Sequence, residues 1–150
     1  MKTILIASDH AGFALKEKVK TYLEKSNLRV KDLGTYSQVR CDYPEFAAAL
    51  AKNISQKKYE RGILICKSGI GNSIVANRFP GVRAALCFSV KAAILSRQHN
   101  DSNVLVLGSA FVSSDLSKKI INIWLKTKFE GGRHKRRLEK IRKIEKEIAR

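Results

Sequence analysis

Residues 62–71 read Gly-Ile-Leu-Ile-Cys-Lys-Ser-Gly-Ile-Gly, and this stretch decides the fold. Its first half is a short apolar run, which predicts a buried strand over residues 62–65. The glycines that follow Cys66 predict a tight loop, and a short helix reaching Asn77 is expected after it. A strand, a loop and a helix in this order form half of a βαβ unit, so the stretch favours a parallel sheet.

The same alternation of strand and helix repeats on both sides of this stretch. Short apolar runs predict further strands at residues 3–7, 30–33, 82–86 and 103–107. Helical spacing predicts helices at residues 13–25 and 90–98, and Pro44 opens another that carries apolar residues as far as Ile54. The expected fold is therefore α/β: a doubly wound, Rossmann-like domain with a five-stranded parallel sheet. A chain of 150 residues suits a single domain spanning residues 1–150.

The C-terminal part of the sequence predicts two more helices. Ser114 or Asp115 is expected to cap the first, which ends before Gly131-Gly132. In the second, apolar residues recur on one narrow stripe of an otherwise charged helix: Leu138, Ile141, Ile144 and Ile148. Such a helix packs either on the core of its own chain or on a second subunit.

Composition limits the classes of protein that this chain can belong to. The formal charge of +17, from 30 basic and 13 acidic side chains, predicts attraction to polyanions, phosphorylated metabolites or anionic surfaces. No segment approaches the roughly 18 to 20 consecutive apolar residues that span a bilayer. The odd set of Cys41, Cys66 and Cys87 has no metal-ligand spacing, and the first apolar run is too short for a signal peptide. We therefore expect a cytoplasmic protein with reduced thiols.

Polar residues follow three of the predicted strands. They are Asp9-His10, the loop from Cys66 to Gly71, and Gly108-Ser109. Ligands of open α/β sheets bind at the carboxyl ends of the strands, near the point where the strand order reverses. The sequence thus predicts that these three segments meet on one rim of the sheet.

Cys66 has two interpretations. A cysteine at the end of a strand is often a small buried apolar residue. Backbone amides of a glycine loop can instead bind anions and lower the pKa of a neighbouring thiol, which makes a base or a nucleophile. The loop has neither the GxxxxGK[ST] order of a Walker loop nor the GxGxxG pattern, so nucleotide binding is not expected.

The histidines and the C-terminal arginines are also open to two interpretations. His10 and His99 either satisfy loop hydrogen bonds or move a proton and bind phosphate. Arg133 and Arg137 lie four residues apart on one helical face, where they either clamp a phosphate or form a solvated basic face. His134 lies within this basic run, and we expect it to face solvent.

Five motifs together resemble the sugar-phosphate isomerase family that contains ribose-5-phosphate isomerase B and galactose-6-phosphate isomerase. They are Ser8-Asp9-His10-Ala11-Gly12, Cys41-Asp42-Tyr43-Pro44, CKSGIG from Cys66, SRQHND from Ser96 and EGGRHKRR from Glu130. The resemblance covers essentially the whole chain. It implies an aldose-ketose isomerase of the pentose phosphate pathway, which interconverts ribose 5-phosphate and ribulose 5-phosphate through a cis-enediolate without a metal or an organic cofactor.

The resemblance also implies a role for each matching residue. Cys66 would move the proton between C1 and C2, and His99 would assist opening of the furanose ring. The positions that would bind the substrate are Asp9, His10, Asp42, Tyr43, Ser68, Gly69, Ile70, Gly71, Asn100, Arg133 and Arg137. Within this set, the loop amides would stabilise the enediolate, and His10 with the two arginines would hold the phosphate.

The resemblance further implies a homodimer, or a tetramer of paired dimers, in which His99 and the arginines reach the other chain's Asp9 and Cys66. Two positions depart from the family pattern, where many relatives have glycine in place of Lys67 and a phosphate-binding arginine in place of Ala110. A hexose-6-phosphate isomerase of the allose or galactose type is therefore the enzymatic alternative. The net charge leaves a nucleic-acid-binding module as the non-enzymatic one.

Overall fold

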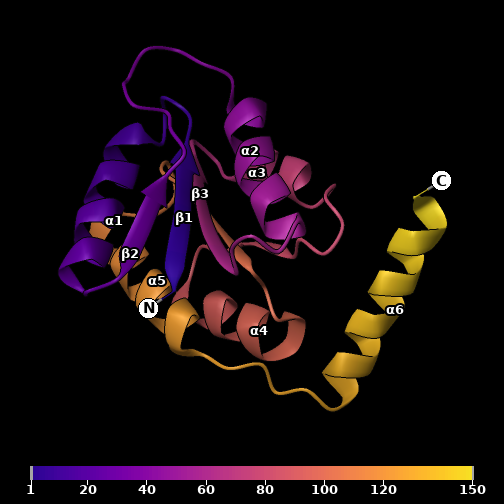
Figure 1. The fold of residues 1–150 in the computed structure, drawn as a ribbon. Coiled ribbons are helices and arrows are strands. Elements are labelled where there is room, and N and C mark those ends of the chain that lie inside the picture. The colour runs from indigo at the N-terminus through magenta and orange to yellow at the C-terminus, as the bar shows by residue number, and fades with distance from the viewer. Residues whose placement is uncertain (1, 150) are drawn as a thin grey trace.

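The computed structural model describes residues 2–149 and shows a five-stranded, all-parallel sheet with helices on both faces (Figure 1). The strands are β1 (Thr3–Ser8), β2 (Arg29–Asp32), β3 (Arg61–Cys66), β4 (Ala84–Leu86) and β5 (Val104–Gly108). The helices are α1 (Phe13–Lys25), α2 (Tyr43–Ser55), α3 (Ile70–Ala76), α4 (Val90–Asn100), α5 (Ser114–Lys126) and α6 (Arg133–Ile148). The α/β fold and the five parallel strands predicted from the sequence are confirmed.

The strand order β2-β1-β3-β5-β4 puts β3 at the centre of the sheet. Cys66, the last residue of β3, pairs with Gly108 of β5, and Ile65 pairs with Ser8 of β1. The chain winds outward from β1 in one direction and from β3 in the other, so the switch point of the sheet lies between these two strands. Cys66 and Asp9 therefore stand on either side of the position where open α/β sheets bind ligands.

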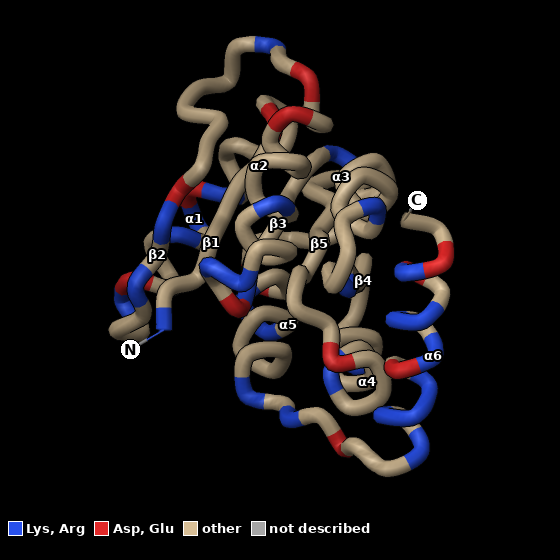
Figure 2. Tube along the Cα trace, turned by 45° about the vertical axis from the view of Figure 1, so that its right-hand side comes forward, with Lys and Arg blue, Asp and Glu red and all other residues tan. Residues whose placement is uncertain are grey.

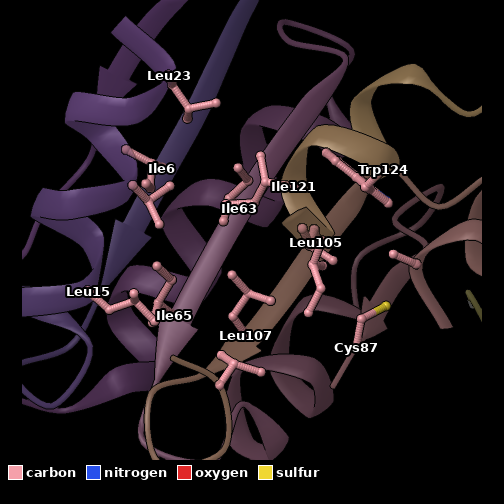
Figure 3. Packing of buried hydrophobic residues seen from close by; sticks show 14 of the residues in the cluster. Ile6, Leu15, Leu23, Ile63, Ile65, Cys87, Leu105, Leu107, Ile121 and Trp124 are labelled. Atoms are coloured by element: carbon pink, nitrogen blue, oxygen red, sulfur yellow. The ribbon is translucent and has the colours of Figure 1, made fainter. Parts of the chain in front are cut away.

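Each face of the sheet has its own hydrophobic core. On one face the side chains of β1, β3 and β5 pack against α1, α4 and α5, with Leu23 and Trp124 among the fully buried residues (Figure 3). On the other face they pack against α2 and α3. Burial of each such large apolar side chain contributes about 1.5–3 kcal/mol. The two cores hold the strand ends, and hence the rim loops, in place.

The start of α5 differs from the prediction. The residue that caps the helix is Ser113, whose Oγ accepts a hydrogen bond of 3.1 Å from the Leu116 N–H. Ser114 and Asp115 already lie in the first turn. The reason is that Ser113 has an extended backbone, which aims its side chain at the free amides of that turn.

Helix α6 stands away from the rest of the chain (Figure 1). Its first turn contacts α4, and further along the carboxylate of Glu145 accepts a hydrogen bond of 3.1 Å from the Gly81 N–H. The predicted apolar stripe is left largely uncovered, with Ile141, Ile144 and Ile148 exposed by 43%, 52% and 73%. The chain's own core therefore does not cover this stripe.

Lysine and arginine are concentrated along α6, as Figure 2 shows. Most of them are exposed, so the basic character predicted for the C-terminal part is a property of this helix. Among the described residues, no helix combines the length and the apolar character that crossing a membrane requires.

Candidate active site

The loops that follow β1, β3 and β5 are bonded to one another at the carboxyl edge of the sheet. The Ser109 N–H donates to the Cys66 carbonyl at 2.9 Å, and the Ser109 hydroxyl donates to the Ala11 carbonyl at 3.0 Å. Gly12 lies so close to β3 that a Cβ there would be 2.4 Å from the Ile65 carbonyl oxygen. The predicted meeting of these three segments on one rim is confirmed.

We call the predicted residues on this rim the carboxyl-edge site. They are Asp9, His10, Asp42, Tyr43, Cys66, Ser68, Gly69, Ile70 and Gly71.

The loop after Cys66 depends on two glycines. Gly69 has a φ of +79°, which side chains rarely adopt, and its N–H donates to the Cys66 Sγ at 3.2 Å. Gly108 of the neighbouring strand leaves room for the loop, because a Cβ there would lie 2.4 Å from the Ser68 carbonyl oxygen. The glycines thus bend the loop so that a backbone amide points at the thiol.

Burial raises the pKa of the Cys66 thiol, which is only 4% exposed. The backbone amides of Asn72, Gly69 and Ser68 lower the pKa, as expected for a glycine loop, whereas the charge of Asp9 raises it. The net direction is upward. Within one chain, the loss of hydration therefore outweighs the amides of the loop.

His10 and Tyr43 are positioned by the segment that enters α2. The Cys41 N–H donates to His10 Nδ1 at 3.2 Å, so the loop hydrogen bond considered for this histidine is present and engages Nδ1. The Tyr43 ring covers Gly71, where an added Cβ would be 2.4 Å from Tyr43 Cζ. Residues 41–43 thereby close the carboxyl-edge site from the side of α2.

The remaining predicted residues lie at the opposite edge of the sheet. His99 and Asn100 end α4, a few residues before β5 begins at Val104. The length of β5 alone, from Val104 to Gly108, is about 13 Å. A single chain therefore does not bring Cys66 and His99 together.

Arg133 and Arg137 share the first turns of α6, next to the end of α4. We call the group formed by His99, Asn100, Glu130, Arg133, His134 and Arg137 the amino-edge cluster.

His134 is buried, and the expectation that it faces solvent is wrong. Its side chain is 4% exposed and its ring stacks on that of His99, with centroids 4.3 Å apart. Gly131 and Gly132 have φ of +72° and +57°, so the chain turns back and aims the second residue of α6 at α4. Burial lowers the pKa of the His134 imidazole, and the charge of Arg133 lowers it further.

Two features of the site had no counterpart in the sequence interpretation. Glu130 Oε1 lies 3.8 Å from His99 Nε2, which places this carboxylate in the amino-edge cluster. Asn72 is fully buried beside Cys66, and its side-chain amide has no hydrogen-bond partner within residues 2–149. The Gly-Gly pair before α6 was the available signal for the first; the sequence offers none for the second.

The two positions that depart from the family pattern are neighbours. The Ala110 N–H donates to the Lys67 carbonyl at 2.9 Å, and both side chains are exposed. The backbones of the two positions are thus in direct contact.

A thiol, a carboxylate and an imidazole at the switch point of a parallel sheet, beside an exposed lysine, are suited to proton transfer on a small anionic substrate. The chain belongs to the Ribose/Galactose Isomerase family, whose family model matches residues 4–141.

Individual relatives are similar over nearly their whole length. Ribose-5-phosphate isomerase B of Escherichia coli (strain K12) is 46% identical over 97% of both chains. The structure of ribose-5-phosphate isomerase B from Clostridium thermocellum is 44% identical, with a TM-score of 0.95 and coverage of 97% of this chain and 99% of that one. The enzyme from Mycoplasma genitalium with bound ribulose-5-phosphate is 45% identical, with a TM-score of 0.92 and coverage of 97% of each.

Proposed function

We propose that the protein is an aldose-ketose isomerase that interconverts ribose 5-phosphate and ribulose 5-phosphate. The observation that carries this proposal is the position of Cys66, at the switch point and opposite Asp9, in a chain of the Ribose/Galactose Isomerase family. The similar M. genitalium enzyme has ribulose-5-phosphate bound. Three free cysteines suit the reducing cytosol, where we place the reaction.

Cys66 is the proposed base. Its thiolate takes the proton from C2 of the open-chain aldose and returns it to C1, while a hydroxyl proton passes from O2 to O1. Between the two steps the substrate is a cis-enediolate, and the amides from Ser68 to Gly71 are placed to stabilise its oxygen charge. Because burial keeps most of the thiol protonated, the reaction runs through a small thiolate fraction.

The other half of the site comes, in this proposal, from a second copy of the chain. His99 assists ring opening, Asn100 holds a sugar oxygen, and Arg133 with Arg137 binds the phosphate together with His10 of the first copy. The separation of the amino-edge cluster from Cys66 within one chain supports this arrangement. In a two-fold dimer, the carboxyl-edge site of each copy would meet the amino-edge cluster of the other copy, and both active sites would be complete.

The uncovered stripe of α6 supports the same dimer. Between this helix and the body of the chain lies a groove of about 460 Å³, whose apolar lining includes Leu138, Ile141, Ile144 and Ile148. Exposed isoleucines beside such a groove are typical of an interface that a second subunit covers.

The direct test of the reaction is to incubate the purified protein with ribose 5-phosphate and to follow ribulose 5-phosphate. A folded protein that gives no turnover would contradict the proposed reaction.

The shared site has a separate test, which uses two inactive variants. Cys66→Ala and His99→Asn are refolded together, with each variant refolded alone as the control. In a shared site, half of the dimers are mixed and each has one intact site, so about a quarter of the wild-type activity returns. A site contained in one chain would give no recovery.

A hexose-6-phosphate isomerase is the second candidate, and the exposed pair of Lys67 and Ala110 is the observation that favours it. In this candidate, Lys67 supplies the positive charge that an arginine at position 110 supplies in many relatives, so the phosphate would bind at a shifted position. The kcat/KM values for ribose, allose and galactose phosphates separate the two candidates. If Lys67 binds the phosphate, Lys67→Gln raises KM for the preferred sugar and leaves kcat largely unchanged.

A further inference from the structure

Three side chains with metal-ligand chemistry meet where the end of α4 contacts the start of α6. They are His99, Glu130 and His134, and one nitrogen or oxygen atom of each lies within 4.8 Å of the other two. The histidine rings are stacked 4.3 Å apart, and Glu130 Oε1 is 3.8 Å from His99 Nε2. Three separate segments therefore direct their polar atoms at one point.

His134 supplies an independent sign that something binds there. Its side chain is 4% exposed, and its Nε2 is buried with no hydrogen-bond partner in the described part of the chain. A buried polar nitrogen without a partner costs stability, so a water molecule, an ion or another bound group that satisfies it would be favoured. The neighbouring imidazole and carboxylate add two further electron-pair donors, which favours a cation among these groups.

We propose that His99, Glu130 and His134 bind a divalent transition-metal ion of the zinc class, and that this ion inhibits the isomerase. Two imidazole nitrogens, one carboxylate oxygen and a water molecule are a ligand set that Zn²⁺ commonly takes. Mg²⁺ and Ca²⁺ prefer sites made of oxygen atoms and are not expected here. The inhibition rests on the function proposed above, because the ion would withdraw His99 from ring opening. The binding of the ion does not depend on that function.

The backbone around the site is already held in place. The Glu130 N–H donates to the Gln98 carbonyl at 3.1 Å, and Arg97 Nε donates to the Thr127 carbonyl at 3.2 Å. Zinc ligands lie about 2.0–2.2 Å from the ion, so the side chains must draw together and the two rings must rotate out of their stack. Rotation of side chains is sufficient, since the segments that carry them already meet.

Nearby positive charge limits the affinity. Arg133 and Arg137 lie on the same helix turns as His134 and repel a cation. We therefore expect a site that is weaker than a structural zinc site and that responds to the concentration of the free ion. Such a site suits inhibition rather than the folding of the chain.

Titration of the full-length, metal-free protein with Co²⁺ tests the binding. We expect one ion per chain, with visible absorption bands and without the near-ultraviolet charge-transfer band of a thiolate ligand. Glu130→Gln and His134→Gln should each weaken binding by about tenfold or more. Glu139→Gln, on an exposed residue of α6 outside the cluster, is the matched control and should bind like the wild type. Because Glu130 is exposed, its variant tests the site even if His134→Gln fails to fold.

Inhibition is measured with Zn²⁺ and ribose 5-phosphate. With each rate expressed relative to the same variant's metal-free rate, Glu130→Gln should raise the half-inhibiting Zn²⁺ concentration by about tenfold or more. Binding of Co²⁺ that survives both substitutions, that is lost in Cys66→Ser, or that is absent at millimolar ion would overturn the proposed site. If the protein binds Co²⁺ through the cluster but does not isomerise ribose 5-phosphate, the site is supported and the proposed function is not.

Discussion

The ionisation of Cys66 gives the sharpest test of the proposed mechanism. Burial and the charge of Asp9 raise the pKa of this thiol, so the free protein holds it mainly protonated near neutral pH. A thiol with the ordinary pKa of about 8.5 is about 3% ionised at pH 7, and Cys66 should be ionised less than that. Below its pKa, the thiolate fraction grows tenfold for each pH unit. From pH 6 to pH 8 it should therefore rise about 100-fold, without a plateau.

Two measurements follow this fraction. The rate of alkylation of Cys66 by iodoacetamide, read by mass spectrometry, should show the full increase. The kcat/KM for ribose 5-phosphate should show the same slope, because it reports the ionisation of the free enzyme. Cys87 serves as an internal reference that stays unmodified, since burial raises its pKa to about 11 and it is 1% exposed.

Asp9→Asn should increase the thiolate fraction of Cys66, because the charge of Asp9 raises the pKa of this thiol. The amide oxygen of asparagine can still accept the Gly12 N–H, as Asp9 Oδ1 does at 3.0 Å, but the negative charge is gone. The pKa of Cys66 should fall, and alkylation at pH 7 should become faster although the sugar contact is damaged. A plateau of the wild-type rate below pH 7, or slower alkylation in this variant, would refute the account of the thiol.

Three further predictions concern stability, the loop and the dimer. Asp32→Asn removes the carboxylate 2.5 Å from the fully buried ammonium of Lys16 and leaves it only the exposed Glu17 at 3.4 Å, so it should lower the free energy of unfolding in urea by about 3–5 kcal/mol. Glu17→Gln, which removes only this weaker and exposed partner, is the comparison and should cost about 1 kcal/mol or less. Burial raises the pKa of the Asp32 carboxyl, but its hydrogen bonds lower the pKa by more, so the folded protein has the lower value. The stability that the Asp32 carboxylate contributes is therefore present above the unfolded pKa of about 3.9 and is lost as the pH falls through the folded pKa. Gly69→Ala forces a side chain into a φ of +79° and should reduce kcat by about tenfold or more, which a steady-state assay with circular dichroism as the folding control would show. Ile144→Lys puts a charge on the uncovered stripe of α6 and should shift the proposed dimer towards monomer in analytical ultracentrifugation; an unchanged mass would contradict an interface on this stripe.

The sheet could be predicted from the sequence because its signals are local. Each strand is a short apolar run, and each connecting helix shows apolar residues at helical spacing. The rim followed from these assignments, since the carboxyl ends of parallel strands must meet at one edge. Cys66, Asp9 and His10 lie at that edge for this reason alone.

The pKa of Cys66 and the burial of His134 depend on the packed structure, and a sequence pattern does not contain that information. The pKa of Cys66 rises because desolvation outweighs three amides, and the extent of burial is a property of the packed rim. His134 is buried because two glycines with positive φ reverse the chain in one particular direction. Its neighbours on α6 are exposed lysines and arginines, so composition alone indicates the opposite.

Helix α6 carries both the uncovered apolar stripe and part of the amino-edge cluster. Its apolar stripe predicts a packing partner, and its first turn carries the arginines and the buried histidine, but the helix covers neither the chain's own core nor Cys66. In the proposed dimer a second copy covers the stripe and brings the amino-edge cluster to the thiol at the same time. Assembly and catalysis would then depend on the same helix. An ion that rotates His134 and His99 out of their stack would act where α6 meets the end of α4, and it would disturb a catalytic histidine. For this reason the metal site is proposed to inhibit the enzyme rather than to stabilise the fold.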